Sequence, residues 1–228
     1  MLGSDTAAEA TRGPGRDPGA GTLTAAMELL LIRHGLPVRI ESDREVDPGL
    51  TPLGHDQARA LATWLEAEPP DALVTSPMAR AVETAAPLAE RFGLTPVVDD
   101  DLAELDRGAT VYIPLEEIKG TDDPRWLELM GDWVGPAGAA RRVAFQARVV
   151  AAVERQIAAR PGSRVAVVCH GGVINTFLSS VLGTEQTFFF EPHYTSISRV
   201  LAHPDGRRQL HSVNETAHLR SVGDALPA

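Results

Sequence analysis

Two short apolar runs constrain the fold of this chain more than any other feature of its sequence. Residues 29–32 read Leu-Leu-Leu-Ile, and residues 164–169 read Arg-Val-Ala-Val-Val-Cys. An unbroken run of this length is typical of a strand covered on both faces, as in a parallel sheet between helices. Weaker strand patterns cover residues 72–74 and 96–98, with a C-terminal hairpin formed by 197–202 and 209–213.

Helical patterns fall between these runs. Four segments repeat apolar side chains at helical spacing, and they cover residues 54–66, 77–91, 141–159 and 172–182. The second segment begins with Ser76-Pro77, which predicts Ser76 at the N-cap and Pro77 at the first helical position. Strands that alternate with helices predict an α/β fold, namely a three-layer α/β/α sandwich with a largely parallel central sheet and no second domain.

The composition is that of a soluble globular protein. The chain has 228 residues, 43% of them hydrophobic, and no apolar stretch approaches the roughly 18–20 residues that span a bilayer. The formal net charge is −10, which repels phosphate backbones, so we expect neither nucleic acid nor a membrane as a partner. Cys169 is the single cysteine, so no intrachain disulfide can form. The sequence leaves a homodimer open.

The first 26 residues differ in composition from the rest. They are rich in Gly, Ala, Pro and Thr and hold no apolar run of the kind found in a secretory signal. Such a segment buries too little apolar surface to order itself. We therefore expect residues 1–26 to form a disordered N-terminal tail and residues 27–228 to form the domain, and we expect the protein in the cytoplasm.

Chemically versatile side chains follow three of the predicted strands. The first long run ends in Arg33-His34, the second ends in His170, and the strand at 72–74 leads into a helix with Arg80 in its first turn. The carboxyl ends of parallel strands meet at one edge of a sheet, where ligands bind in open α/β folds. We therefore expect two histidines and two arginines to converge on one site.

Each of these residues also has an ordinary structural explanation when taken alone. A single histidine at a strand end is more often structural than catalytic, and Arg80 could simply point into solvent. An arginine in the first turn opposes the positive end of the helix dipole, however, which favours an anion between Arg80 and the helix end. The convergence of four such residues favours an anion site over four separate structural roles.

Six stretches together resemble the histidine phosphatase superfamily, in its phosphoglycerate-mutase-like branch. Their order and spacing match the family across about residues 28–220. They are Leu-Leu-Leu-Ile-Arg-His-Gly (29–35), Leu-Thr-Pro-Leu-Gly-His-Asp-Gln-Ala (50–58), Thr-Ser-Pro-Met-Ala-Arg-Ala-Val-Glu-Thr-Ala (75–85), Leu-Ala-Glu (102–104), Val-Cys-His-Gly-Gly (168–172) and Asn-Glu-Thr-Ala-His-Leu (214–219). The resemblance implies a phosphoglycerate-mutase-like fold and a metal-independent hydrolase, without a cofactor, that acts on a small phosphorylated metabolite.

The resemblance also implies a role for each residue of the site. His34 would be the nucleophile and form a phosphohistidine. The phosphoryl oxygens would be bound by Arg33, Arg80 and a charged His170, helped by the Gly171 amide at a helix start. These groups supply the positive charge and the positioning that phosphoryl transfer needs.

Glu104 matches the position of the family's proton donor. To act near neutral pH, its pKa would have to lie above the usual value of a glutamate. Neighbouring acids could raise it, and they are Asp99, Asp100, Asp101 and Asp106. Without the family, the same stretch would be interpreted as a solvated acidic loop, and Asp106 is the second choice for the acid. Supporting positions around the site are Thr51, Gln57, Thr195 and Ser196.

Other functions stay open at this point. A phosphoglycerate mutase is the rival within the family. The residues after Glu104 lack the Tyr-Gly and Gln-Gly of the family's mutases, and the pair Arg141-Arg142 looks solvent-facing, which favours hydrolysis. A non-catalytic phosphate-binding module is the rival from another class. A metal-dependent phosphohydrolase built on His55-Asp56 lacks the companion ligands that it would need.

Two segments depart from the family's pattern. Residues 37–41 stand where many members carry an asparagine, and residues 108–112 replace the Trp-Glu-Gly that often follows the acid. The segment 106–140 is expected to form either a cap over the pocket or ordinary surface, and its aromatic residues are Tyr112, Trp126 and Trp133. The substrate contacts are therefore the part of the site that the resemblance defines least.

Overall fold

A six-stranded sheet forms the centre of the protein. The computed structural model describes residues 26–113, 122, 124 and 136–222. The strands lie in the order β4-β3-β6-β1-β7-β8. Their bounds are Met27–Arg33 (β1), Ala72–Thr75 (β3), Val97–Val98 (β4), Arg164–Cys169 (β6), Ile197–Ala202 (β7) and Arg208–Glu215 (β8). The first four strands in this order are parallel, while β7 and β8 add an antiparallel edge.

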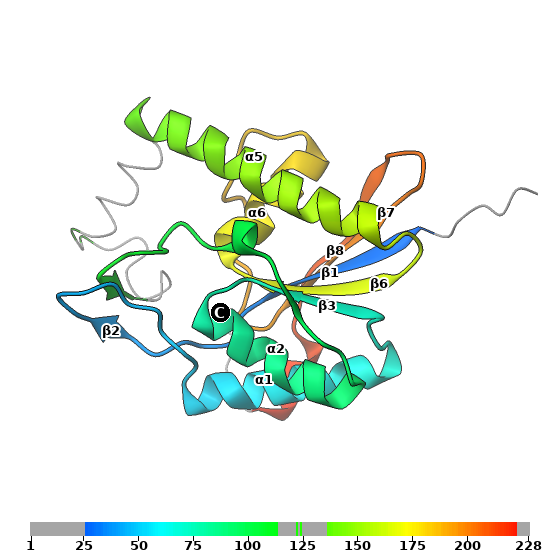
Figure 1. Cartoon of the computed structure of the whole chain (residues 1–228), viewed down its shortest axis with the longest axis horizontal. Coiled ribbons are helices and arrows are strands. Elements are labelled where there is room, and N and C mark those ends of the chain that lie inside the picture. The colour runs from blue at the N-terminus through cyan, green and yellow to red at the C-terminus, as the bar shows by residue number, and fades with distance from the viewer. Residues whose placement is uncertain (1–25, 114–121, 123, 125–135, 223–228) are drawn as a thin grey trace, which may run out of the picture.

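Helices cover both faces of this sheet, as Figure 1 shows. One face packs against α1 (Pro52–Trp64) and α2 (Ala79–Phe92), and the other packs against α5 (Pro136–Ala159) and α6 (Gly171–Leu182). Successive side chains of a strand point to opposite faces. Leu30 therefore joins the core under α1 and α2, while Leu29 and Leu31 join the core under α5 and α6. The predicted α/β/α sandwich is confirmed.

Shorter elements complete the described part of the chain. Three are 3-10 helices, namely η1 (Leu65–Ala67), η2 (Asp100–Leu102) and η3 (Ala217–Ser221). Two form a separate antiparallel ribbon, β2 (Ile40–Glu41) with β5 (Val111–Tyr112). No helix within the described ranges is long and apolar enough to cross a membrane. The tail prediction falls on residues 1–25, which lie outside the described residues, so it stays a prediction.

The predicted N-cap of the second helix is wrong, and the helix predicted over 141–159 begins earlier, at Pro136. The structure begins α2 at Ala79 with Met78 at the N-cap, so Ser76 and Pro77 precede the helix. The Ser76 hydroxyl lies 2.7 Å from His170 Nε2 and accepts a hydrogen bond from the Met78 amide. A carboxylate from another loop caps the helix instead, because both oxygens of Asp47 accept from the Ala79 amide. Arg80 remains in the first turn, as expected.

Candidate active site

The parallel pairing of β1 with β6 creates the centre of the site. Arg33 lies opposite Cys169 in the register, so His34 and His170 follow at adjacent strand ends. Their ring centroids are 5.2 Å apart. Both imidazoles are buried, and the predicted convergence of the two histidines is confirmed by this geometry.

Two buried arginines flank the histidines. Arg80 enters from the first turn of α2 with 1% of its surface exposed. Arg33 donates from Nη1 to the carbonyl of Pro192 at 2.6 Å, and its guanidinium lies 4.0 Å from the ring centroid of Tyr194. Burying two guanidinium groups in one place is costly unless an anion or a carboxylate compensates them.

His34 is prepared as an electron-pair donor. Its Nδ1 lies 2.8 Å from the carbonyl oxygen of Gly35, which can only accept, so Nδ1 carries the proton. The lone pair then lies on Nε2. Burial, and then the charges of Arg80 and Arg33, hold the pKa of His34 well below its usual value. The ring is therefore neutral at neutral pH and able to act as a nucleophile.

His170 is held through one ring nitrogen. Its Nε2 pairs with the Ser76 hydroxyl, and its buried Nδ1 has no hydrogen-bond partner among the described residues. Burial, followed by the charges of Arg80 and of His34, holds the pKa of His170 well below its usual value. The environment therefore opposes the charged imidazole that the resemblance implies, and the charge of His170 during the reaction stays a prediction.

Glu104 lies against the start of α6. Its Oε2 accepts from the Gly172 amide at 2.7 Å, and its Oε1 accepts from the Leu105 amide at 3.0 Å. A Cβ on residue 172 would meet the carboxylate at 2.4 Å, so a larger residue there would displace Glu104 from its present position. Burial, and then the charge of Asp106, raises the pKa of Glu104 against the lowering effect of the two amides.

The other predicted acidic neighbours point away from Glu104. Asp99 and Asp101 form ion pairs with Arg155 of α5, and Asp100 lies 3.4 Å from Arg107. Of the four aspartates proposed to raise the pKa of Glu104, only Asp106 contributes. The reason is that η2 turns the preceding three side chains toward α5 and toward solvent.

Unmet hydrogen-bond donors indicate what the site binds. Arg80 Nε and Nη1 are buried and lack a hydrogen-bond partner within the described part of the chain, as does His170 Nδ1. Buried donors are almost always paired in native proteins. An anion with several acceptor oxygens would pair them, and a phosphoryl group has the charge and the oxygen count to do so. Gly171 is the first residue of α6, so its amide lies at the helix start, and its contact with a phosphoryl oxygen stays a prediction.

A shell of polar side chains fixes the loop after His34. Gly35 and Gly54 cross so closely that a Cβ on Gly35 would lie 2.7 Å from the Gly54 carbonyl oxygen. Thr51 donates to the carbonyl of Leu36, and Gln57 accepts from the Leu36 amide. On the other side, the Thr195 amide donates to the backbone carbonyls of Arg33 and His34, and the Arg33 amide donates to the Ser196 carbonyl. The four predicted supporting positions therefore all lie beside the site.

Sequence reasoning missed three side chains at this site. Ser76 pairs with His170, Thr84 accepts from the Gly35 amide, and Tyr194 lies over Arg33 with its ring centroid 5.7 Å from that of His34. Ser76 and Thr84 were signalled by the 75–85 motif that contains them. The sequence left open whether Tyr112 belongs to a cap over the pocket or to ordinary surface. Its ring centroid lies 4.6 Å from the central carbon of the Arg80 guanidinium. Trp126 and Trp133 lie outside the described residues.

The described residues hold no cluster of metal ligands of the kind that a metal-dependent phosphohydrolase would need. Across the described ranges, no three His, Cys, Asp or Glu side chains are grouped as they would be around a metal ion. His55 lies on α1 and faces Glu83 at 3.6 Å, away from Asp56, which pairs with Arg59.

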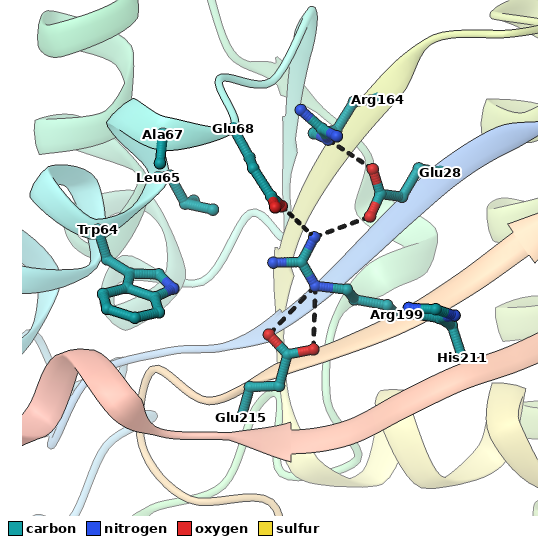
Figure 2. Close-up of a pocket in the computed structure, with 9 residues that line it drawn as sticks. All are labelled: Glu28, Trp64, Leu65, Ala67, Glu68, Arg164, Arg199, His211 and Glu215. Atoms are coloured by element: carbon teal, nitrogen blue, oxygen red, sulfur yellow. Dashed lines mark hydrogen bonds and ion pairs between the residues drawn. The ribbon is translucent and has the colours of Figure 1, made fainter.

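A cavity of about 410 Å³ lies elsewhere, at the amino end of β1 and β6. Figure 2 shows Arg199 of β7 at its floor, pointing toward Glu28, Glu68 and Glu215. Trp64 and Leu65 form the apolar side of this cavity. None of the predicted site residues lines it.

Comparisons with known proteins place the chain in a family. A protein of Mycobacterium tuberculosis described as bifunctional is 32% identical over 93% of this chain, which spans only 60% of that relative. Two relatives are 28% identical. A probable phosphoglycerate mutase of Yersinia enterocolitica matches over 69% of this chain and 75% of its own length. A glucosyl-3-phosphoglycerate phosphatase of Mycolicibacterium vanbaalenii matches over 68% of this chain and 74% of its own length.

The fold agrees with these relatives. The crystal structure of a phosphoserine phosphatase from Entamoeba histolytica superposes with a TM-score of 0.67 at 24% identity, covering 85% of this chain and 99% of that one. The sequence pattern of the Histidine phosphatase superfamily (branch 1) matches residues 29–216. The chain therefore belongs to the histidine phosphatase superfamily.

Proposed function

We propose that this protein is a phosphomonoester hydrolase that works through a phosphohistidine on His34. The observation that carries the proposal is a neutral His34, with its lone pair on Nε2, beside two buried Arg80 donors and the His170 Nδ1 atom, all three without partners in the described part of the chain. A nucleophile next to groups that can bind an anion is the arrangement that phosphoryl transfer requires.

The proposed reaction has two balanced steps. In the first, His34 Nε2 attacks phosphorus, the P–O bond to the alcohol breaks, and Glu104 gives its proton to the departing oxygen. In the second, water attacks the phosphohistidine, the P–N bond breaks, and Glu104 takes back a proton. Glu104 needs a raised pKa for the first step, which its burial and Asp106 provide.

The cationic residues stabilise the charge that spreads over the phosphoryl oxygens. Arg33 and Arg80 are permanently charged and fixed by burial, so they need little rearrangement when the substrate arrives. His170 offers its Nδ1, with the ring held by Ser76. A dianionic phosphoryl group would favour protonation of His170, and the charged ring would then add to the positive charge around the oxygens. No metal is required in this scheme.

Replacing the nucleophile tests the proposal. His34→Ala should lower the rate of p-nitrophenyl phosphate hydrolysis by about 10⁴-fold or more and abolish labelling by a radioactive phosphate ester. His55→Ala is the matched control, because His55 lies on the surface of α1 and should be dispensable. Both assays are run in EDTA. Full activity in a folded His34→Ala protein would contradict the mechanism, and activity that needs an added divalent metal would contradict metal independence.

A panel of phosphorylated metabolites separates hydrolysis from isomerisation. One relative is described as a probable mutase, so 3-phosphoglycerate with catalytic 2,3-bisphosphoglycerate belongs in the panel. Arg141 of α5 is exposed, as expected, whereas Arg142 is half-buried. The sequence after Glu104, which lacks the Tyr-Gly and Gln-Gly of the family's mutases, is what supports a hydrolase. Rapid formation of 2-phosphoglycerate with negligible free phosphate would favour the mutase instead.

A further inference from the structure

One short segment supplies Glu104 and two further side chains that contact Arg80. Both oxygens of Asp106 accept from Arg80 Nη2, at 2.8 and 3.0 Å. The ring of Tyr112 lies against the same guanidinium, 4.6 Å from its central carbon to the ring centroid. Arg80 is therefore held from two sides by residues that follow the acid by two and eight positions.

The backbone that carries Tyr112 is itself anchored. Tyr112 pairs with Ile40 in the ribbon of β2 and β5, and two further backbone bonds, Ser42 to Thr110 and Val46 to Ala109, extend the pairing. These two strands come from the segments 37–41 and 108–112, where the sequence departs from the family's usual pattern. The two segments that depart from the family's pattern therefore pair with each other, and this pairing places the ring of Tyr112 over Arg80.

Asp106 interacts with a cation, Arg80, and with a second carboxyl group, that of Glu104. On one side is Arg80, almost fully buried, while the Asp106 side chain is 28% exposed. On the other side is Glu104, whose ionisation a neighbouring negative charge opposes. The groups that face Glu104 are Asp106 from its own loop, Arg80 from α2 and the Cys169 thiol from β6. Burial raises the pKa of Cys169, so that thiol stays uncharged.

We propose that Asp106 and Tyr112 are positioning residues for the phosphoryl transfer, with Asp106 fixing Arg80 beside Glu104 and Tyr112 holding the plane of the Arg80 guanidinium. This inference rests on the proposed function. With Nη2 occupied by Asp106, the remaining Arg80 donors, Nε and Nη1, are directed by the protein rather than by the incoming substrate. Preorganised donors of this kind need no reorientation during the reaction.

The pH profile of Asp106→Asn tests the first half. Removing the charge lets Glu104 ionise at lower pH, so the alkaline limb of kcat/KM for an alkyl phosphate should move to lower pH. At pH 7.5 the loss should be about tenfold, smaller than loss of the acid itself. With p-nitrophenyl phosphate, whose leaving group hardly needs a proton, the loss should be smaller, because only the displacement of Arg80 contributes to it. A limb that does not move would overturn the role of Asp106.

Paired replacements of Tyr112 test the second half. Tyr112→Leu removes the ring and should weaken inhibition by inorganic phosphate about three- to fivefold, while Tyr112→Phe keeps the ring and should match the wild type. Equal inhibition of all three proteins would overturn the role of Tyr112. Thermal unfolding of each variant shows whether the fold is retained.

A neighbouring ion pair provides the control. Asp100→Asn removes a carboxylate from the same acidic stretch that faces Arg107 and solvent, so its pH profile should equal that of the wild type. Failure of this inference is distinguishable from failure of the proposed function. If the wild type forms a His34-dependent phosphoenzyme and Asp106→Asn behaves like it, only the positioning role fails. If His34→Ala is fully active, the proposed function fails.

Discussion

Two arginines at opposite ends of the sheet show how a binding site differs from a structural ion cluster. Arg80 and Arg199 are both buried. Arg199 reaches three carboxylates, since Nη1 donates to Glu28 and Glu68 and Nε donates to both oxygens of Glu215. Arg80 reaches one carboxylate through Nη2, and its Nε and Nη1 have no partner among the residues that the structure describes.

The difference lies in what completes each charge. The Arg199 cluster beside the cavity of Figure 2 is compensated by the protein's own acids, so it requires nothing from outside. The Arg80 site has its cations and donors in place before any anion is bound. A buried polar group without a hydrogen-bond partner destabilises the fold. Such groups are retained most readily where a bound ligand supplies the missing hydrogen bonds. The cavity of Figure 2 and the candidate active site are therefore in different places.

The largest expected effect comes from exchanging each arginine for methionine, an apolar side chain of similar length. Arg80→Met should lower kcat/KM by about 10²–10³-fold, because it removes preorganised donors from the phosphoryl oxygens. Its unfolding free energy should change little, since Arg80 is poorly compensated in the unliganded protein. Steady-state kinetics and urea unfolding of the same preparation measure both quantities.

Arg199→Met should do the reverse. It leaves Glu28, Glu68 and Glu215 without their shared cation, so the unfolding free energy should fall by roughly 2–4 kcal/mol. At a temperature where the variant is folded, its kcat/KM should equal that of the wild type. The comparison of the two regions fails if Arg80→Met is the less stable variant and Arg199→Met the less active one.

The carboxylates of the two regions should differ in the same way. Burial and Asp106 raise the pKa of Glu104. Burial also acts to raise the pKa of Glu28, but hydrogen bonds from Arg199 and Arg164 outweigh it and lower that pKa. Glu104→Gln should reduce turnover of alkyl phosphates about 10²-fold or more and that of p-nitrophenyl phosphate far less. Glu28→Gln should leave both rates unchanged. Equal losses on the two substrates in Glu104→Gln would show that another group is the acid.

Much of the fold and of the arrangement of the candidate active site could be predicted from the sequence. The apolar runs at 29–32 and 164–169 have only one way to be covered on both faces, so the parallel core of the sheet followed from them. Placing Arg33-His34 and His170 at the ends of these runs then fixed their convergence. Glu104 is different, because its acidic surroundings looked like a solvated loop, and only the family pattern selected it.

What the sequence could not predict depends on contacts between distant segments. The residues around Ser76 predict a helix cap at this position. Instead, the Ser76 hydroxyl pairs with His170, 94 residues away in the sequence, and Asp47 caps α2. The residues of the Arg199 cluster come from four segments of the chain, and no local sequence pattern predicts their contact. The position of Tyr112 depends on the pairing of two two-residue strands, in which Tyr112 lies opposite Ile40. Strands this short show no alternation of apolar and polar residues in the sequence.

The smallest expected effect concerns His218, a buried imidazole that contacts both regions indirectly. Its Nε2 lies 3.0 Å from the Thr195 hydroxyl, and the Thr195 amide binds the carbonyls of Arg33 and His34. Its ring also borders a second cavity beside Trp64, the residue that lines the cavity of Figure 2. His218 therefore supports the loop behind the candidate active site and lines a cavity next to Trp64.

Protonation of His218 should make the fold acid-sensitive. Burial, its largest influence, lowers the pKa of His218 to about 4, whereas the unfolded chain takes up the proton near pH 6.5. Between these values the unfolded state binds more protons, so stability is lost as the pH falls from 6.5 toward 4. His218→Gln removes this contribution and should flatten the decline in the urea midpoint between pH 7 and pH 5. A residual slope is expected, because His34 and His170 are also held neutral by burial. Identical slopes for the variant and the wild type would mean that His218 is not held neutral in the folded protein.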